Sequence, residues 1–212
     1  MSSWIIYSIG FLAQILFSSR LIIQWVTSEK QQRVITPTLF WTLSLIASVL
    51  LFIYGYLRYD FSIMLGQSLT YYIYIRNLQL QKQWYKFPKA LQLFLLIFPA
   101  LIVIYYFNNN KIDINLLFNN EDIPFWLLGL GIVAQIIFTL RFVYQWLYSE
   151  AKKSSILPFG FWLLSLIGSI LILTYAVIRT DWVLLMGHGL GSIIYARNIY
   201  LIHRTDATKT TK

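Results

Sequence analysis

The chain has 212 residues, of which 58% are hydrophobic and only 12% are charged, and its formal net charge is +9. Soluble domains usually carry about a quarter charged residues, and a chain of this size cannot bury so much apolar surface in a water-soluble core. The composition therefore excludes an ordinary soluble domain and indicates an integral membrane protein. Because the chain has no cysteine and only two histidines, we expect no disulfide scaffold, no metal centre and no cofactor.

Apolar runs of membrane-spanning length recur along the whole chain. The predicted spans, in chain order, are residues 4–27, 36–57, 61–81, 88–107, 124–148, 157–178 and 182–203. The short termini and loops leave no room for a soluble domain, so we expect function within or beside the bilayer. The predicted fold class is an all-α integral membrane protein with seven transmembrane helices.

The basic residues gather in the loops on one side of the predicted spans. That side receives Lys30, Arg33, Lys82, Lys86, Lys89, Lys152, Lys153, Arg204, Lys209 and Lys212, whereas the other side receives Arg58, Lys111 and Arg179. By the positive-inside rule, the N-terminus faces out and the C-terminus faces the cytoplasm of a bacterial inner membrane. The same rule accounts for the net positive charge without a nucleic-acid partner.

The chain is a tandem repeat with an offset of 121 residues. The motif at 20–29 reads Arg-Leu-Ile-Ile-Gln-Trp-Val-Thr-Ser-Glu, and the motif at 141–150 reads Arg-Phe-Val-Tyr-Gln-Trp-Leu-Tyr-Ser-Glu. Each repeat holds three predicted spans and another span joins them, which predicts two parallel three-helix repeats in a SWEET-like 3+1+3 arrangement. The predicted domains are a first triple-helix repeat at 1–82, a linker helix with its loops at 83–123, a second triple-helix repeat at 124–204 and a polar cytoplasmic tail at 205–212.

Polar residues shared by the two repeats form a predicted layer near the cytoplasmic ends of the spans. A charge inside the bilayer costs several kcal/mol unless it is paired or wetted, and guanidinium groups match phosphate oxygens well. We therefore predict a substrate site for an anion. Its residues are Arg20, Gln24, Arg76, Asn77, Arg141, Gln145, Arg197 and Asn198. The structural alternative stays open: arginines that reach the headgroups, or Arg–Glu pairs that tie helices together.

A second shared polar set lies nearer the predicted midplane. It comprises Gln14, Gln67, Gln135 and His188, of which Gln67 and His188 occupy the same repeat position. We predict that these side chains line a headgroup pathway. A histidine inside the membrane can also relay protons. The alternative is ordinary hydrogen bonding within the helix bundle.

These motifs resemble the Lipid A Biosynthesis N-terminal domain family. The resemblance rests on Arg-x-x-x-Gln-Trp-x-x-Ser-Glu, Pro-x-x-Phe-Trp-x-x-Ser, Arg-x-Asp, Gly-Gln or Gly-His, and Tyr-x-Arg-Asn, and it covers about residues 4–82 and 125–203. It implies membership of the PQ-loop, SWEET-like group, passage through a cleft between two triple-helix bundles, and a link to envelope glycolipids. A lipid-A-disaccharide synthase label is attached to such domains. Because the sequence contains no Gly-rich nucleotide-sugar domain of a glycosyltransferase, an enzyme is the least favoured interpretation.

The leading prediction is a transporter or flippase that moves an anionic glycolipid or a polyprenyl-phosphate-linked sugar between leaflets, by alternating access between the two repeats. The first alternative is a non-transporting membrane scaffold or accessory subunit for a lipid A-modifying enzyme. The second alternative is a small-sugar transporter. The expected partners are a membrane lipid or a polyprenyl-phosphate-linked sugar, together with envelope-lipid enzymes.

Overall fold

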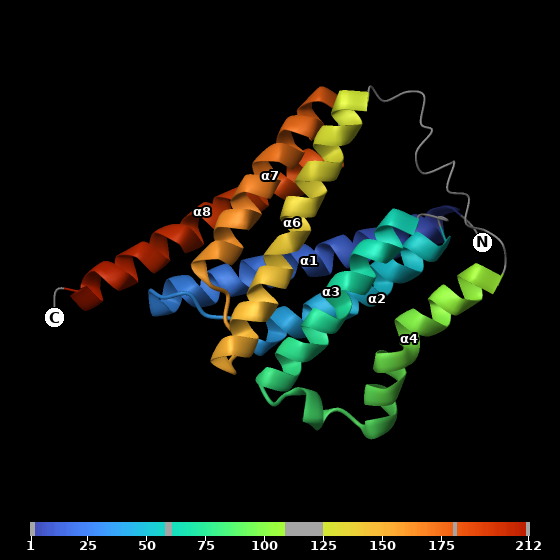
Figure 1. Ribbon diagram of the computed structural model, residues 1–212, viewed down its shortest axis with the longest axis horizontal. Helices are drawn as coiled ribbons and strands as arrows, with labels where there is room; N and C mark the ends of the chain where they lie inside the picture. Colours follow the sequence, from blue (N-terminus) through green and yellow to red (C-terminus); the bar gives the residue numbers. More distant parts are fainter. Residues whose placement is uncertain (1–2, 58–60, 109–124, 180–181, 211–212) are drawn as a thin grey trace. The chain divides into compact units, whose positions relative to one another are not determined.

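The computed structural model describes residues 3–57, 61–108, 125–179 and 182–210, and the regular structure in these ranges is helical (Figure 1). The α-helices are α1 (Ser3–Gln31), α2 (Thr38–Leu57), α3 (Phe61–Leu80), α4 (Lys89–Asn108), α6 (Phe125–Lys152), α7 (Phe159–Arg179) and α8 (Trp182–Thr210). A short 3₁₀ helix, η1 (Trp84–Lys86), follows α3. Each predicted span overlaps one helix, although α1, α6 and α8 extend beyond the predicted ends at 27, 148 and 203. The all-α fold class is confirmed.

Three helices in the described ranges are long and apolar enough to cross a membrane. Their spans are Trp4–Gln31 in α1, Gly129–Lys152 in α6 and Phe159–Ile178 in α7. The apolar stretches of α2 and α4, Thr38–Tyr54 and Lys89–Leu101, are shorter. Large hydrophobic side chains are widely exposed on these helices, which is favourable in lipid and costly in water. The structure therefore supports association with a membrane, and the count of seven spans stays a prediction.

The repeat in the sequence produces the same local turn twice. After α1 the chain turns at Gln32 with φ 51°, and after α6 it turns at Lys153 with φ 50°. The next backbone N–H donates back to the carbonyl oxygen of Ser28 at 3.3 Å in the first case and of Ser149 at 3.1 Å in the second. These are helix ends closed by a left-handed residue, and they turn the chain toward α2 and α7 respectively.

The residues divide into two compact units that cut across the repeats. Unit 1 comprises Met1–Phe17 and Trp41–Glu121, and unit 2 comprises Ser18–Phe40 and Asp122–Lys212. The single helix α1 therefore contributes its first half to unit 1 and its second half to unit 2. The predicted domain boundaries follow the repeats instead, and they stay a prediction.

A proline inside α4 shapes the packing of unit 1. Pro99 has no N–H, so the carbonyl oxygen of Leu95, four residues earlier, receives no helical hydrogen bond. The Tyr71 hydroxyl of α3 donates to this oxygen at 2.7 Å, and the Tyr72 hydroxyl donates to the next carbonyl oxygen, that of Leu96, at 3.1 Å. The two tyrosines thus join α3 to α4, and Tyr71 does so at the carbonyl oxygen that Pro99 leaves open.

The apolar core of unit 1 also joins α4 to α2. Phe52 of α2 and Phe98 of α4 are buried, with ring centroids 6.1 Å apart in an edge-to-face arrangement. Val49, Ile53 and Tyr56 pack around this pair from α2. Aromatic pairs in this geometry contribute more than their buried area alone.

In unit 2, α7 packs against both α6 and α8. The approach of α7 to α6 is close at Gly168, where an added Cβ would lie 3.0 Å from the Cα of Phe138. A small residue at such a crossing lets two helix backbones approach, which is how helices associate in lipid. Gly131 of α6 instead packs against a side chain, the ring of Tyr175 on α7.

The contact between Tyr71 and Leu95 is testable through the proline that creates it. We expect Tyr71→Phe to lower the free energy of unfolding by about 1 kcal/mol, because a partly buried carbonyl oxygen loses its donor. In a Pro99→Ala background the restored N–H can serve the same oxygen, so the cost of Tyr71→Phe should shrink. Unfolding of the four variants in one detergent measures both costs, and equal costs in the two backgrounds would contradict the assignment.

Candidate functional site

A pair of buried amides joins the two repeats inside unit 2. Gln24 Nε2 of α1 donates to Asn198 Oδ1 of α8 at 2.8 Å, and Asn198 Nδ2 donates to Gln24 Oε1 at 3.1 Å. Both side chains are fully buried. Because each amide satisfies the other, two polar groups are held in the interior at little cost. This contact fixes the second half of α1 against the C-terminal half of α8.

The shared glutamines also hold the loops that follow their helices. Gln24 Nε2 donates to the Ser28 hydroxyl at 2.9 Å and to the Ile35 carbonyl oxygen at 3.3 Å. In the second repeat Gln145 Nε2 donates to the Ser149 hydroxyl at 2.8 Å and to the equivalent loop carbonyl at 2.9 Å. In both repeats the glutamine of the Gln-x-x-x-Ser motif therefore bonds its helix end to the following loop. We call this arrangement a clamp, and it gives Gln24 and Gln145 a structural role.

Arg20 and Arg141 are buried, each 5% exposed, and aromatic rings surround them. The Arg141 guanidinium lies 3.4 Å from the centroid of the Phe138 ring and donates to the Tyr195 hydroxyl at 3.2 Å. Both arginines lie over the ring of Phe142, Arg20 at 5.5 Å and Arg141 at 4.7 Å. Aromatic faces attract a cation at close range, so this frame lowers the cost of holding two charges inside the helices.

Arg197 is more accessible and has an acidic partner. Its guanidinium bonds both carboxylate oxygens of Glu29 through Nε and Nη2, with Nη2 2.9 Å from Oε2. The side chains are 36% and 28% exposed. Trp25 Nε1 also donates to Glu29, and the Tyr200 ring lies 4.9 Å from the Arg197 guanidinium. This is the Arg–Glu pair of the structural alternative, and it joins α8 to the end of α1.

The eight predicted site residues fall in both units. Unit 2 holds Arg20, Gln24, Arg141, Gln145, Arg197 and Asn198. Unit 1 holds Arg76, whose Nη1 donates to Gln79 Oε1 at 3.1 Å, and Asn77, whose Nδ2 donates to the Ile73 carbonyl oxygen at 2.8 Å. The structure brings Gln24 together with Asn198 through hydrogen bonds. It also brings Arg20 and Arg141 to the same aromatic ring, that of Phe142.

The predicted midplane set has varied surroundings. Gln14 is exposed on α1, and the Oε1 atom of Gln67 on α3 is buried with no hydrogen-bond partner among the described residues. His188 Nδ1 lies 3.1 Å from the Ser169 hydroxyl. The side chain of Gln135 lies outside the described residues.

Some contacts of these residues were missed by the sequence reasoning. Ser192 of α8 donates to the Ser169 hydroxyl at 3.0 Å, which extends the histidine contact into a small network. The sequence offered no signal for Ser192, because its position in the first repeat is Tyr71. The aromatic frame was missed as well, although Tyr195 belongs to the shared Tyr-x-Arg-Asn motif and this repetition was a usable signal.

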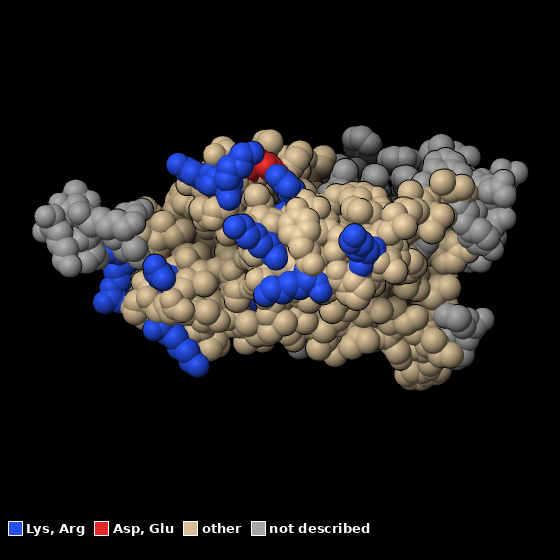
Figure 2. All heavy atoms as spheres, turned by 90° about the horizontal axis from the view of Figure 1, so that it is seen from below, with Lys and Arg blue, Asp and Glu red and all other residues tan. Residues whose placement is uncertain are grey.

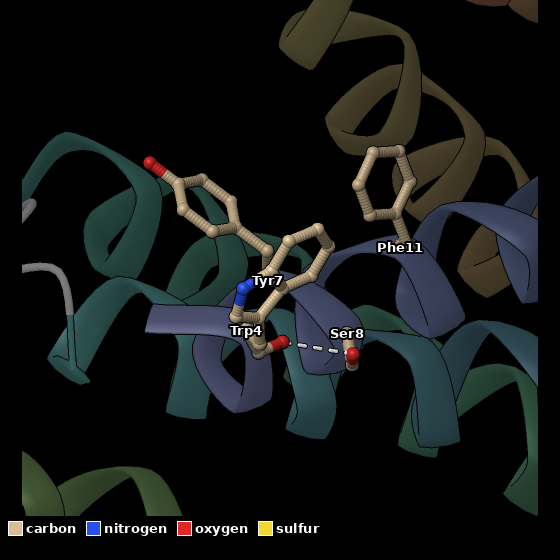
Figure 3. A pocket seen from close by; sticks show the side chains of 4 residues that line it. All are labelled: Trp4, Tyr7, Ser8 and Phe11. Carbon is tan, nitrogen blue, oxygen red and sulfur yellow. Dashed lines mark hydrogen bonds between the residues drawn. The ribbon is translucent and has the colours of Figure 1, made fainter. Parts of the chain in front are cut away.

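A hollow of about 410 Å³ lies on unit 1 against the first turns of α1. Trp4, Tyr7, Ser8 and Phe11 line it (Figure 3). The Ser8 hydroxyl donates to the Trp4 carbonyl oxygen at 2.8 Å, and the Tyr7 hydroxyl points away from the other labelled side chains. The lining is therefore mainly hydrocarbon, which suits an apolar chain better than a charged group. In the described part of the chain, no cluster of three His, Asp or Glu side chains is placed to hold a metal ion.

Comparisons with known proteins match both repeats. The model of the Lipid A Biosynthesis N-terminal domain family matches residues 9–79 and 130–200. A lipid-A-disaccharide synthase of Chlamydia felis is 28% identical over 94% of this chain and 33% of its own length. The proteins of the same name from Chlamydia pneumoniae and Chlamydia muridarum are 28% and 29% identical, over 95% and 96% of this chain and 34% and 35% of their own lengths. The chain thus spans about a third of the length of these relatives. No solved structure matches.

These names correct the leading functional prediction. The relatives are named for a synthase, which makes a bond, and not for transport of a lipid or a sugar. The prediction of a transporter or flippase is therefore wrong, and so is its small-sugar variant. The relatives are not named for a scaffold either. The error came from taking parallel repeats around a polar layer as evidence of a pathway, because the same pattern also builds buried clamps such as those of Gln24 and Gln145.

The amide pair can be tested by a double-mutant cycle. We expect Gln24→Leu and Asn198→Leu each to lower the free energy of unfolding by about 1–3 kcal/mol, because each leaves a buried amide without its partner. The double variant should lose less than the two costs together. Gln14→Leu on the exposed side of α1 is the matched control, expected to change stability by less than about 0.5 kcal/mol. Additive losses in detergent unfolding would count against a direct pair.

Proposed function

We propose a function for this chain on the premise that it belongs to the Lipid A Biosynthesis N-terminal domain family. The chain acts in lipid A biosynthesis as the membrane-embedded part of lipid-A-disaccharide synthesis. In this role it holds the acylated sugar substrate at the membrane, where the sugar of one lipid is joined to that of another.

The observation that carries the proposal is the pairing of the relatives' name with the character of the helices. The relatives are named lipid-A-disaccharide synthase, and α1, α6 and α7 are long and apolar enough to cross a membrane. A substrate with acyl chains must be met in or at the bilayer, because the chains do not leave it readily. A helical surface with exposed hydrocarbon is suited to that contact.

The described residues suit binding better than bond formation. The acidic side chains that the structure describes, Glu29 and Glu150, have partners in Arg197 and Lys153, whereas sugar transfer calls for a carboxylate or another base at the reacting hydroxyl. We therefore assign to these residues the placing of the lipid, and we assign the transfer step to parts of the synthase outside them.

We propose the finer arrangement that the sequence predicts. The seven helices each span a bacterial inner membrane in a 3+1+3 order, with the N-terminus out and the C-terminus in the cytoplasm. Exposed basic residues at the ends of α1 and α6 support this orientation: Lys30, Arg33, Lys152 and Lys153. The sugar-transferring part would then meet the lipid at the cytoplasmic face.

We keep the predicted polar set as the part of the chain that receives the headgroup, with different tasks for its members. The buried amides Gln24, Gln145 and Asn198 position the helices, and Arg20 and Arg141 supply positive potential from within their aromatic frame. The partner proposed is an acylated or polyprenyl-phosphate-linked sugar.

The proposal predicts a lipid phenotype. Deleting the gene in its own bacterium should lower the lipid A disaccharide and raise its acylated monosaccharide precursor, measured by mass spectrometry of the extracted envelope lipids. The wild-type chain and the surface variant Arg33→Gln should restore the disaccharide, whereas Arg20→Gln combined with Arg141→Gln should not. An unchanged disaccharide level after deletion would refute the proposed function.

A further inference from the structure

Arg197 holds Glu29 in the geometry by which arginine also binds phosphate. The guanidinium uses Nε and Nη2 against the two carboxylate oxygens. Such fork-to-fork pairing is shared by carboxylate and phosphate groups, because both present two oxygens at a matching separation. Glu29 is therefore the internal equivalent of an anionic ligand on Arg197.

This ion pair is open to the surface, unlike Arg20 and Arg141. The side chains of Arg197 and Glu29 are 36% and 28% exposed. Tyr200, one turn further along α8, is 53% exposed, and its ring lies 4.9 Å from the Arg197 guanidinium. An ion pair this exposed contributes little to stability, so an incoming anion would lose little by displacing Glu29.

The surroundings of the pair carry an excess of positive charge. Lys30 and Arg33 are exposed beside Glu29 at the end of α1. Arg204, two turns beyond Arg197 on α8, donates to the neutral amide of Gln32 at 2.9 Å. Figure 2 shows that basic side chains are more prominent than acidic ones on the face it draws. Such an excess attracts a further anion to this end of unit 2.

The pair also lies at the level expected for lipid headgroups. Glu29 is two residues before the end of α1 at Gln31, where a membrane-spanning helix leaves the hydrocarbon. Trp25, which donates to Glu29, and Tyr200 are residue types enriched at this interface. The anions that a bilayer presents at this depth are the phosphate groups of its lipids.

We infer that Arg197 and Tyr200 form a binding site for a phosphate group, and that the phosphate displaces Glu29 from the guanidinium. The inference rests on the proposed function, because it names the phosphate of a lipid substrate as the group recognised. The same chemistry could come from free phosphate, so the experiment tests both sources.

The experiment titrates the full-length chain in detergent and counts bound ligands by native mass spectrometry. One arm uses phosphatidic acid, a lipid with a phosphate monoester, and the other uses inorganic phosphate. Glu29→Gln should bind about tenfold more tightly than the wild type, because the internal competitor is removed, and Arg197→Gln should bind about tenfold more weakly. Because the loss of one charge shifts anion affinity in the same two directions by itself, the size of the shifts is compared with that in charge-matched controls.

Two controls match the changes in charge. Glu150→Gln removes the same charge from the equivalent position of the second repeat, where Glu150 pairs with Lys153. Lys152→Gln removes an exposed cation from the end of α6. Both should leave the affinity within about twofold of the wild type, since diffuse attraction by one surface charge is weak. Unfolding midpoints show whether each variant remains folded.

Opposite shifts for phosphatidic acid alone would support a lipid-borne phosphate, and opposite shifts for inorganic phosphate as well would support a free phosphate group. Shifts that the controls share, or no shift in Glu29→Gln, would overturn the inference. Because the readout is binding and not disaccharide formation, it is independent of the gene-deletion result that decides the proposed function.

Discussion

A polar group inside a bilayer has no water to bond, so the protein itself must supply its partner. Several buried polar groups of the described residues meet this constraint, whereas Gln67 Oε1 does not. The amides of Gln24 and Asn198 bond each other at depth, and the carbonyl oxygen that Pro99 leaves open receives the hydroxyl of Tyr71. The same requirement turns shared polar residues into joints between helices, and these joints hold α1 to α8 and α3 to α4.

Charges meet the constraint in two different ways. Arg141 is buried among rings and one tyrosine hydroxyl, whereas Arg197 sits at the rim with a carboxylate. Aromatic faces lower the cost of a buried cation without neutralising it. The carboxylate neutralises its cation but leaves the pair accessible. The buried arginines, Arg20 and Arg141, thus contribute positive electrostatic potential and packing. Arg197 is the arginine of these three whose side chain is exposed enough for a ligand to reach.

The two repeats share local structure but differ in the length of their third helices. The two copies form the same turn after their first helices, at Gln32 and Lys153. Their third helices differ: α3 ends at Leu80, whereas α8 continues to Thr210. The end of α3 is closed by Lys82, which takes a left-handed conformation with φ 59°, and the next backbone N–H, that of Gln83, donates back to the Leu78 carbonyl oxygen at 2.9 Å. Duplication preserved the buried clamps and left the helix end free to diverge. Repeated architecture alone was a poor guide to activity, since one fold serves many chemistries.

The sequence by itself determined the number and place of the described α-helices and their apolar character, because hydropathy acts over a few neighbours. It did not determine where α1, α6 and α8 end, and for α1 and α6 the end depends on a backbone turn that hydropathy does not report. The sequence also identified which residues are polar in both repeats, including Arg20 and Arg197. Only the tertiary structure decided the partner of each. In a duplicated chain Gln24 has two chemically equal candidates, Asn77 and Asn198, and a local pattern cannot rank them. The fold ranks them by packing the second half of α1 with α8, and that choice depends on contacts between residues 174 positions apart.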